Sequence, residues 1–302
     1  MSKIGRTRIA AADMGQEPAT ADGRSTSVAA VLPSYKEPPA AIETTVRALL
    51  TQTVPFSAIV LVDDGSPTPA TLGNIADPRV LVLTMKENVG ISAARNAGVL
   101  NVQTEFVACI NIDVLPDSNW LETCADYLVV HPKAGIVATR IIPLHPEERL
   151  ARWRMMFHER PFPAQSGVVP WMAGHAMLIR LEAFHAVGGF DERMRRFDED
   201  VDFCHRVRDA GWEVHFLSES GSRSIQEDTV EVLGRTELNR SGWTRDRRQG
   251  FLRAAYGPTK RTILRIGRHV LSGRFGFLWI EVRIWMTGIR ILRNFYESKG
   301  SG

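Results

Sequence analysis

The sequence predicts an α/β fold in which a mostly parallel central sheet is covered by helices on both faces. Strand-like apolar runs alternate, along most of the chain, with segments whose apolar residues recur at helical spacing. The strand-like runs are almost continuously apolar, as expected of strands that are buried on both faces. Clusters of polar residues follow several of these runs, and such sheets bind ligands at the carboxyl ends of their strands.

The individual elements follow in order from these patterns. Short apolar runs bounded by turn residues predict strands at residues 28–33, 58–62, 80–84, 106–110, 135–140, 172–180 and 212–217. Apolar residues at helical spacing predict helices at residues 39–51, 91–100, 121–130, 181–187 and 201–210. Residues 141–170 are rich in Pro, Arg and aromatic residues, which predicts a long structured connection. Beyond Gly234 the pattern is helical and basic.

Composition is typical of an ordinary globular protein, with 44% apolar and 24% charged residues in 302. The three cysteines are far apart and lack CxxC spacing, which argues against a disulfide framework or a zinc site and favours a reducing compartment. Residues 1–27 have no continuous apolar core, so we expect a disordered tail and no secretory signal. No window of about 18 apolar residues predicts a membrane-spanning helix.

Charge is distributed unevenly along the chain. Residues 235–302 contain 15 Lys+Arg and 4 Asp+Glu, a net charge of +11, so residues 1–234 carry 22 minus 30, or −8. Such segregation indicates that the two parts face different partners. Nucleic acid is not expected among them, because no recognised binding motif accompanies the basic region.

The acidic pair Asp63 and Asp64 follows the second predicted strand. Carboxylates at a strand end can accept hydrogen bonds from a base or ribose, or hold a cation that binds phosphates. The alternative is a simple turn, and Asp-Gly-Ser chemistry favours the turn when this motif is taken alone. In residues 88–98, a turn precedes a helix in which Arg95 and Asn96 can reach a diphosphate or ribose, the alternative being a helix with a surface arginine.

Two further polar clusters follow the fourth strand and precede a helix. Asn111 and Asp113 are two residues apart, so in an extended chain they point the same way and can share one metal ion; a polar strand end is the alternative. Residues 198–202 hold four carboxylates, which repel one another unless cations or a helix N-terminus offset them. One of the four can cap the following helix, and a carboxylate that faces an alcohol can act as a general base.

The ordered set of motifs resembles glycosyltransferase family 2, whose members have the GT-A fold. The resemblance covers roughly residues 28–230, and it depends on five segments occurring in order. These segments are residues 63–66, 88–98, 111–113, 188–192 and 199–206. A nucleotide-binding methyltransferase or dehydrogenase is disfavoured, because the first strand ends in Pro33-Ser34-Tyr35 rather than in a glycine-rich turn.

The resemblance implies roles by position. It implies that Asp63 contacts the donor base with Asp64 beside it, that Asp200 is the catalytic base, and that Asp113 is the last carboxylate of the metal-binding motif. The implied donor-binding residues are Pro33, Tyr35, Glu37, Asp63, Asp64, Asn88, Gly90, Arg95, Asn96 and Asn111. The implied acceptor-side residues are Trp171, Gly174, Glu199 and Asp202.

Two departures from the family pattern concern the metal, which the resemblance implies to be Mg²⁺ or Mn²⁺. Asn111 stands where the family has the first Asp of its metal motif, and the late metal-ligand His is replaced by Ser224 or Gln226. Both changes lower the ligand charge, so we expect weak metal binding, or binding only together with the nucleotide diphosphate.

The expected function is inverting transfer of a sugar from a nucleotide-diphospho-sugar to a hydroxyl of a glycan or lipid-linked acceptor, of the kind seen in bacterial rhamnosyltransferase-like members. The alternative is a weak or inactive GT-A protein that only binds nucleotide-sugars or glycans. We expect a catalytic domain at residues 28–234, with the donor side at 28–115 and the acceptor side at 116–234, and a basic helical region at 235–302.

The basic helical region has two interpretations. Leu278, Val282, Trp285, Ile289, Leu292 and Tyr296 follow helical spacing with arginines between them. This face either packs on the catalytic domain or lies on an anionic membrane through residues 259–298. We therefore expect a cytoplasmic protein, peripheral on the inner face of the membrane if the second interpretation holds.

Overall fold

The computed structural model describes residues 27–157, 163–195, 198–239 and 251–300. The chain divides into two compact units, which are described separately. The sheet unit comprises residues 1–144 and 162–226, and the helical unit comprises residues 145–161 and 227–302. The predicted tail at residues 1–27 lies outside the described residues except for Ser27.

The sheet unit is built on one sheet with the strand order β3-β2-β1-β4-β8-β6-β9-β5, and β7 pairs with β9. Its strands are β1 (Val28–Ser34), β2 (Ala58–Asp63), β3 (Val80–Thr84), β4 (Phe106–Ile110), β5 (Val114–Pro116), β6 (Ala134–Pro143), β7 (Gly167–Val168), β8 (Ala176–Arg180) and β9 (Glu213–Ser224). Its helices are α1 (Pro39–Leu50), α2 (Ile91–Val99), α3 (Trp120–Val130), α5 (Leu181–Ala186) and α6 (Glu199–Asp209).

The predicted fold class is confirmed, and the strand directions refine it. The first half of the sheet is parallel, since β1 pairs in parallel with both β2 and β4, and β2 with β3. The second half is mixed, because β8 runs antiparallel between β4 and β6 while β6 and β9 are parallel. β5 and β7 are short antiparallel strands on β9.

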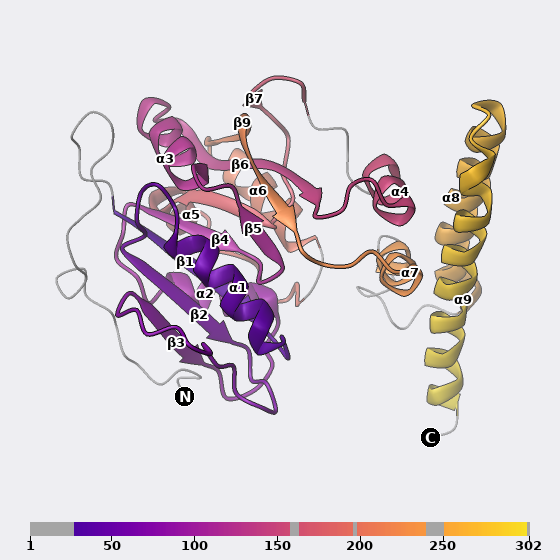
Figure 1. Ribbon diagram of the computed structural model, residues 1–302, viewed down its shortest axis with the longest axis horizontal. Helices are drawn as coiled ribbons and strands as arrows, with labels where there is room; N and C mark the ends of the chain where they lie inside the picture. Colours follow the sequence, from indigo (N-terminus) through magenta and orange to yellow (C-terminus); the bar gives the residue numbers. More distant parts are fainter. Residues whose placement is uncertain (1–26, 158–162, 196–197, 240–250, 301–302) are drawn as a thin grey trace. The chain divides into compact units, whose positions relative to one another are not determined.

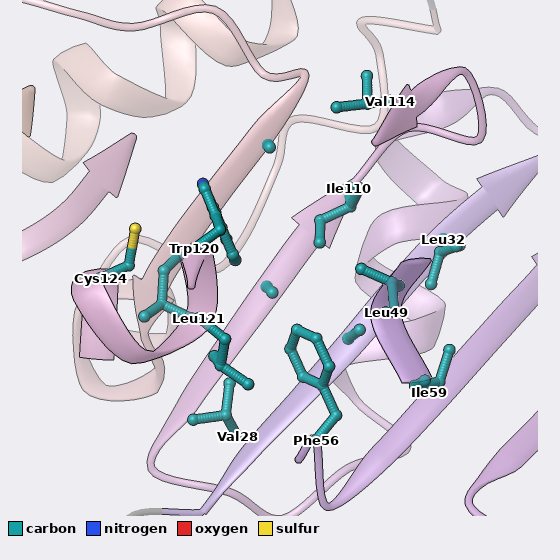
Figure 2. Close-up of a cluster of buried hydrophobic side chains, with 14 of the residues drawn as sticks. Val28, Leu32, Leu49, Phe56, Ile59, Ile110, Val114, Trp120, Leu121 and Cys124 are labelled. Atoms are coloured by element: carbon teal, nitrogen blue, oxygen red, sulfur yellow. The ribbon is translucent and has the colours of Figure 1, made fainter. Parts of the chain in front are cut away.

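Both faces of the sheet are covered, as the continuous apolar strands predict. Alternate residues of β1 enter opposite cores: Ala30 and Leu32 pack in one cluster, and Ala29 and Val31 in the other. The first cluster includes side chains of α1 and α3, and the second includes side chains of α2, α5 and α6. Figure 1 labels these helices around the sheet. Figure 2 shows part of the first cluster, where Trp120 of α3 and Leu49 of α1 lie over the strands.

Several predicted boundaries are wrong where backbone pairing, rather than apolar pattern, defines the element. Residues 141–170 are not one connection, because β6 continues to Pro143 and the segment also contains α4 (Arg149–Phe157) and β7. Strand β8 begins only at Ala176, and the residues before it form a turn. Strand β9 continues to Ser224 through polar residues that pair with β5 and β6.

The helical unit contains α4, α7 (Val230–Asn239), α8 (Phe251–Leu271), the short 3₁₀ helix η2 (Phe275–Phe277) and α9 (Leu278–Gly300). α7 and α9 approach closely at Gly234 and Gly288, where an added Cβ on Gly234 would lie 3.1 Å from the Gly288 nitrogen. The apolar face predicted for the last helix is not free: Leu292 is buried against Leu238 and Ala254, and Tyr296 packs on the same cluster. In the described residues, no helix has the length and apolarity that crossing a membrane requires.

Candidate active site

The carboxyl ends of the first three strands are aligned at one edge of the sheet. Ser34 pairs with Asp63, and Asp63 pairs with Thr84. The loops that follow β1, β2 and β3 therefore begin side by side, at the edge where parallel sheets of this kind bind ligands. This register explains why polar motifs far apart in the sequence act on the same region.

Asp63 holds the loop that follows β2. Its side chain is fully buried, and its two carboxylate oxygens accept hydrogen bonds from the backbone nitrogens of Ser66 at 3.1 Å and Ala70 at 3.0 Å. The Ser66 hydroxyl in turn accepts from the Lys36 nitrogen at 2.9 Å, which joins this loop to the one after β1. The turn interpretation thus describes what the carboxylate does, and its contact with a donor base stays a prediction.

Asp64 holds the loop that precedes α2. Its carboxylate accepts from the Val89 nitrogen at 2.7 Å, the Gly90 nitrogen at 2.9 Å and the Asn88 side-chain nitrogen at 2.9 Å. Burial raises the pKa of Asp64 above its ordinary value, while the hydrogen bonds from Val89 and Gly90 oppose that rise. The motif after β2 and the motif before α2 are therefore one structural unit.

Gly90 sits where only glycine fits. Its φ of +98° lies in the left-handed region, and an added Cβ would lie 2.7 Å from the Arg195 carbonyl oxygen. Arg195 also donates from Nη2 to the Asn88 carbonyl oxygen at 2.6 Å. The glycine thus lets the segment around Arg195 close against the loop before α2.

Arg95 is buried among protein groups, and its predicted contact with a donor diphosphate stays a prediction. Its side chain is 1% exposed and lies inside the sheet unit. Nη1 donates to Glu199 Oε1 at 2.9 Å, and Nη2 donates to the Gly174 carbonyl oxygen at 2.8 Å and to Asn111 Oδ1 at 3.0 Å. The guanidinium therefore connects α2, the end of β4, the turn before β8 and the start of α6.

Asn96 is likewise buried, and its predicted contact with the donor stays a prediction. Its side-chain nitrogen donates to the Phe190 carbonyl oxygen at 2.8 Å, and its oxygen accepts from the Phe190 nitrogen at 2.9 Å. The Asn96 side-chain amide thus both donates to and accepts from the backbone of Phe190, like a pair of hydrogen-bonded residues in two antiparallel strands. It fixes the segment that follows Gly189, whose φ is +77°.

Asp200 is held by backbone nitrogens at the start of α6. Oδ2 accepts from the Gly174 nitrogen at 2.6 Å, and Oδ1 accepts from the Val201 nitrogen at 2.8 Å. The side chain is only partly buried, and the positive end of the helix favours its negative charge. Asp198 precedes the helix with a φ of +61° and makes no side-chain cap.

The neighbouring carboxylates of the acidic run each have a different partner. Glu199 points inward to Arg95; burial raises its pKa, and the adjacent guanidinium opposes the rise. Asp202 accepts from Arg206 at 2.7 Å, and Arg206 also donates to the carbonyl oxygens of Val187 and Gly189. Glu199 and Asp202 thus each pair with an arginine, while the hydrogen bonds of Asp200 come from backbone nitrogens; acceptor contacts by Glu199 and Asp202 stay a prediction.

Asn111 and Asp113 do not share an extended backbone, so that part of the prediction is wrong. The Val114 nitrogen donates to the Asn111 carbonyl oxygen at 3.2 Å and closes a turn, while the Asn111 side chain is bonded to Arg95. Asp113 is partly buried, and its carbonyl oxygen accepts from the Ile225 nitrogen at 2.9 Å. The segment expected to hold the family's late metal ligand thus lies beside Asp113.

The remaining predicted residues are spread along the rim and wall of this region. Tyr35 and Glu37 are exposed after β1, and Pro33 is partly buried within it. Trp171 is partly buried and packs against the second core cluster, and Gly174 lies in the turn where Asp200 and Arg95 meet. No group of three His, Cys, Asp or Glu side chains that could hold a metal ion occurs in the described part of the chain.

Sequence reasoning missed two residues that organise the site. Arg195 binds the loop before α2, and Phe190 exchanges two hydrogen bonds with Asn96. The Gly188-Gly189-Phe190 segment carried a signal, because two consecutive glycines before an aromatic residue indicate a strained turn against a core. Nothing in the pattern around Arg195 distinguishes it from a surface arginine.

Comparison with known proteins agrees with this geometry. The family described as glycosyl transferase family 2 matches residues 29–188, a little over half of the chain. The pre-mycofactocin glycosyltransferase of Mycobacterium tuberculosis is 34% identical over 163 residues, covering 51% of this chain and 34% of that protein. The N-acetylglucosaminyl-diphospho-decaprenol L-rhamnosyltransferase of the same organism is 28% identical over 124 residues, covering 39% and 40% respectively.

Solved structures share the fold. The mannosyltransferase PcManGT of Pyrobaculum calidifontis, in complex with GDP-Man and Mn²⁺, superposes with a TM-score of 0.59 at 15% identity, covering 88% of this chain and 86% of that one. GalNAc-T7 with UDP, GalNAc and Mn²⁺ gives a TM-score of 0.54 at 16% identity, covering 68% and 46%. The chain spans only about a third of the length of the mycofactocin relative. With the family match, the ordered motifs and the shared architecture, the chain belongs to glycosyl transferase family 2 and has the GT-A fold.

Proposed function

We propose that the chain transfers a sugar from a nucleotide-diphospho-sugar to a hydroxyl of a glycan or lipid-linked acceptor, with inversion at the anomeric carbon. Two solved structures with this fold contain UDP or GDP-Man, which supports a nucleotide-sugar donor. The name of one relative contains a diphospho-decaprenol-linked sugar, which supports a lipid-linked acceptor. In this proposal residues 28–115 form the donor side and residues 116–234 the acceptor side.

The position of Asp200 is the observation that carries the proposal. Two backbone nitrogens fix the carboxylate, and Gly174, which supplies one of them, also accepts a hydrogen bond from Arg95 through its own carbonyl oxygen. A general base needs this kind of fixed orientation together with access to its substrate, and Asp200 is only partly buried.

The reaction we propose is a single displacement. Asp200 takes the proton of an acceptor hydroxyl while that oxygen forms a bond to the anomeric carbon. The bond between the anomeric carbon and the diphosphate oxygen breaks on the opposite face, and the nucleoside diphosphate leaves with the electron pair. One displacement without a covalent intermediate inverts the configuration at that carbon.

In this proposal a divalent cation would bind here only together with the diphosphate of the donor. Asp113 is the carboxylate available at the end of β4, because the oxygen of Asn111 is bonded to Arg95. One or two carboxylates plus substrate phosphates are a common way of holding Mg²⁺, and two solved structures with this fold contain Mn²⁺. When bound, the cation would neutralise charge that develops on the departing diphosphate.

Replacement of the proposed base provides the test. Asp200→Asn should lower the transfer rate by about 100-fold or more, because the amide cannot accept the proton, while donor binding is kept. Transfer is measured with a panel of nucleotide-sugars, with and without Mn²⁺, and donor affinity is measured by calorimetry. Asp209→Asn is the matched control, since Asp209 is exposed at the other end of the same helix. Near-normal transfer by the Asp200 variant would exclude it as the base.

A second candidate function is binding of nucleotide-sugars or glycans without catalysis. The pairing of Asn111 with Arg95 favours it, because that pairing removes one expected metal ligand. Binding of a donor by the wild-type chain, with no transfer and no hydrolysis for any donor in the panel, would support this second function and contradict the first.

We also propose that the enzyme works at the cytoplasmic face of the membrane, where a lipid-linked acceptor would be reached. The basic composition of residues 235–302 supports an anionic surface as partner; within the predicted contact region, residues 259–298, Leu292 and Tyr296 of α9 pack inside the helical unit, so the exposed part of α8 is the better candidate. Nucleic acid is not proposed as a partner.

A further inference from the structure

The helical unit exposes an apolar surface on α8 and on the turn that follows it. Nine of the fifteen large apolar side chains that are exposed in the described part of the chain lie between Leu252 and Met286. On α8 they are Leu252, Tyr256, Ile263, Leu264, Val270 and Leu271. Leu252, Tyr256, Ile263 and Val270 recur at intervals of four and seven residues, which places them on one stripe of the helix. Leu264 and Leu271 each follow one of these residues directly, and the apolar stripe is taken to include them.

The opposite face of α8 is buried: its N-terminal part holds Ala254, and its buried side chains from residue 262 onward are polar. Arg265 donates to both oxygens of Glu281 at 3.0 and 2.9 Å and to Glu237 Oε1 at 3.2 Å. His269 lies 3.3 Å from the Glu281 carboxylate, and Thr262 is also buried. The usual arrangement of a surface helix is therefore reversed here, because charged groups attach α8 to α7 and α9 and apolar groups face outward.

Exposed apolar side chains continue from the end of α8 through η2 to the first turn of α9. Leu271 is 90% exposed, and Phe275 and Trp279 are more than half exposed. Arg268 and Arg274 are exposed beside them. An exposed tryptophan with neighbouring arginines is typical of segments that lie at a membrane interface, where an amphipathic ring and snorkelling cations are both accommodated.

The charge of this surface identifies its partner. The α8 segment contains five Lys or Arg and no Asp or Glu, and the first acidic residue of α9, Glu281, is fully buried. A second copy docked face to face on α8 would bring two such cationic helices together, which is unfavourable. An anionic lipid surface instead accepts the apolar side chains and attracts the cations around them.

We propose that α8 and the turn before α9 lie in the interface of an anionic membrane, with the apolar stripe of α8 facing the acyl chains. The helix is 21 residues long and so offers a contact of about 30 Å along the surface. This moves the membrane contact from the face of α9 that the sequence indicated, which packs inside the helical unit, to α8. Membrane binding through α8 does not depend on the catalytic role of Asp200.

Co-sedimentation of the full chain with vesicles tests the apolar stripe. The probe is phosphatidylcholine vesicles containing about 30% phosphatidylglycerol, compared with pure phosphatidylcholine. Ile263→Gln/Leu271→Gln should weaken binding to the anionic vesicles by at least about tenfold, because two inserted side chains are lost. Leu100→Gln/Val130→Gln is the matched control, since both residues are exposed apolar side chains of the sheet unit, and it should bind as wild type.

Substitution of two cationic residues of α8 distinguishes binding to anionic lipid from other apolar contacts. Lys260→Gln/Arg268→Gln should weaken binding to anionic vesicles by roughly tenfold or more and make the remaining binding less sensitive to salt. Lys133→Gln/Arg208→Gln, which removes two exposed cations of the sheet unit, should leave binding unchanged. Unchanged thermal midpoints would show that each variant is folded.

Three results would overturn the proposal. They are absence of binding by the wild-type chain, equal binding to anionic and pure phosphatidylcholine vesicles, and an Ile263/Leu271 variant that dissociates an oligomer while vesicle binding is unaffected. The last result would assign the stripe to a second copy. Because vesicle binding is measured without a sugar donor, these outcomes are distinct from failure of the Asp200 experiment.

Discussion

The two units of the chain each bury an arginine against glutamate, and they use it differently. In the sheet unit Arg95 pairs with Glu199 beside the candidate base, and apolar clusters fill both faces of the sheet around it. In the helical unit Arg265 pairs with Glu281 and Glu237 at the centre of the helices, and much of the apolar surface faces outward.

This difference indicates what each cluster is for. A buried ion pair adds little net stability compared with apolar packing, but losing one partner is costly, so such a pair fixes geometry more than it stabilises. Around Arg95 the fixed geometry is that of the Gly174 turn and Asp200, which belong to the site. Around Arg265 it is the arrangement of α7, α8 and α9 that presents the apolar stripe.

The largest effect is expected from removing the shared acceptor of the helical cluster. Glu281→Ala leaves Arg265 with the Glu237 carboxylate alone, takes the carboxylate away from His269 and removes the acceptor of the Trp153 indole nitrogen, which donates at 2.7 Å. We expect a loss of about 3–5 kcal/mol in the opening free energy of the helical unit. Hydrogen exchange of peptides from residues 251–300, compared with peptides from residues 28–144, measures it.

Glu297→Ala is the matched control for that variant. Glu297 also pairs with an arginine of the same helix, Arg293, but both side chains are about two-thirds exposed. Its removal should change protection by no more than about 0.5 kcal/mol. Equal effects of the two variants would mean that the cluster around Glu281 does not organise the helices.

A smaller effect on stability, with a specific effect on kinetics, is expected at Arg95. Arg95→Lys keeps a positive charge but loses the planar fork that reaches Glu199, Gly174 and Asn111 together, at a cost of about 2–4 kcal/mol. Because Arg95 is buried and acts through the Gly174 peptide, we expect kcat to fall while the donor KM stays near that of the wild type.

The Arg95→Lys variant also distinguishes a positioning role of Arg95 from the donor contact that the sequence motif predicts. A contact between Arg95 and the donor diphosphate, as predicted from the sequence, would raise the donor KM instead. Arg47→Lys is the control, since Arg47 makes an exposed pair with Glu43 on α1 and should alter neither stability nor kinetics. Steady-state kinetics with the donor identified in the panel gives kcat and KM for both variants.

The sequence predicts those strands whose burial leaves an apolar pattern, and it does not predict segments that are held by backbone pairing alone. Apolar runs located the buried strands β1, β2 and β4, because burial on both faces leaves a continuous apolar signal. The extension of β9 to Ser224 was missed, since its last residues are polar and are held by backbone pairing with β5 and β6.

For the candidate site, too, one part was predictable from the sequence and another was not. Ordered motifs located the segments that meet at the site, but they did not show which polar side chains face inward. Arg95, Asn96 and Glu199 have the residue types of a ligand site, and each is buried against protein groups. Apart from Asn111, which is 16 residues from Arg95, the partners cited here are 79 to 104 residues away in the chain, so spacing within one motif carries no information about them.

The smallest expected effect on stability comes from adding one carbon atom at Gly174, and it bears directly on the link between Arg95 and Asp200. A Cβ at this position would lie 2.9 Å from the Asp200 Cβ and 3.2 Å from Arg95 Nη2, so both side chains must move. Gly174→Ala should cost about 1–3 kcal/mol in the free energy of unfolding and lower kcat by about 10- to 100-fold, since small displacements of a base are costly. Gly167→Ala, where no atom lies within 4 Å of the added carbon, should match the wild type in both measurements. A Gly174 variant that keeps its kcat would show that Asp200 tolerates displacement and therefore does not act through the fixed geometry seen here.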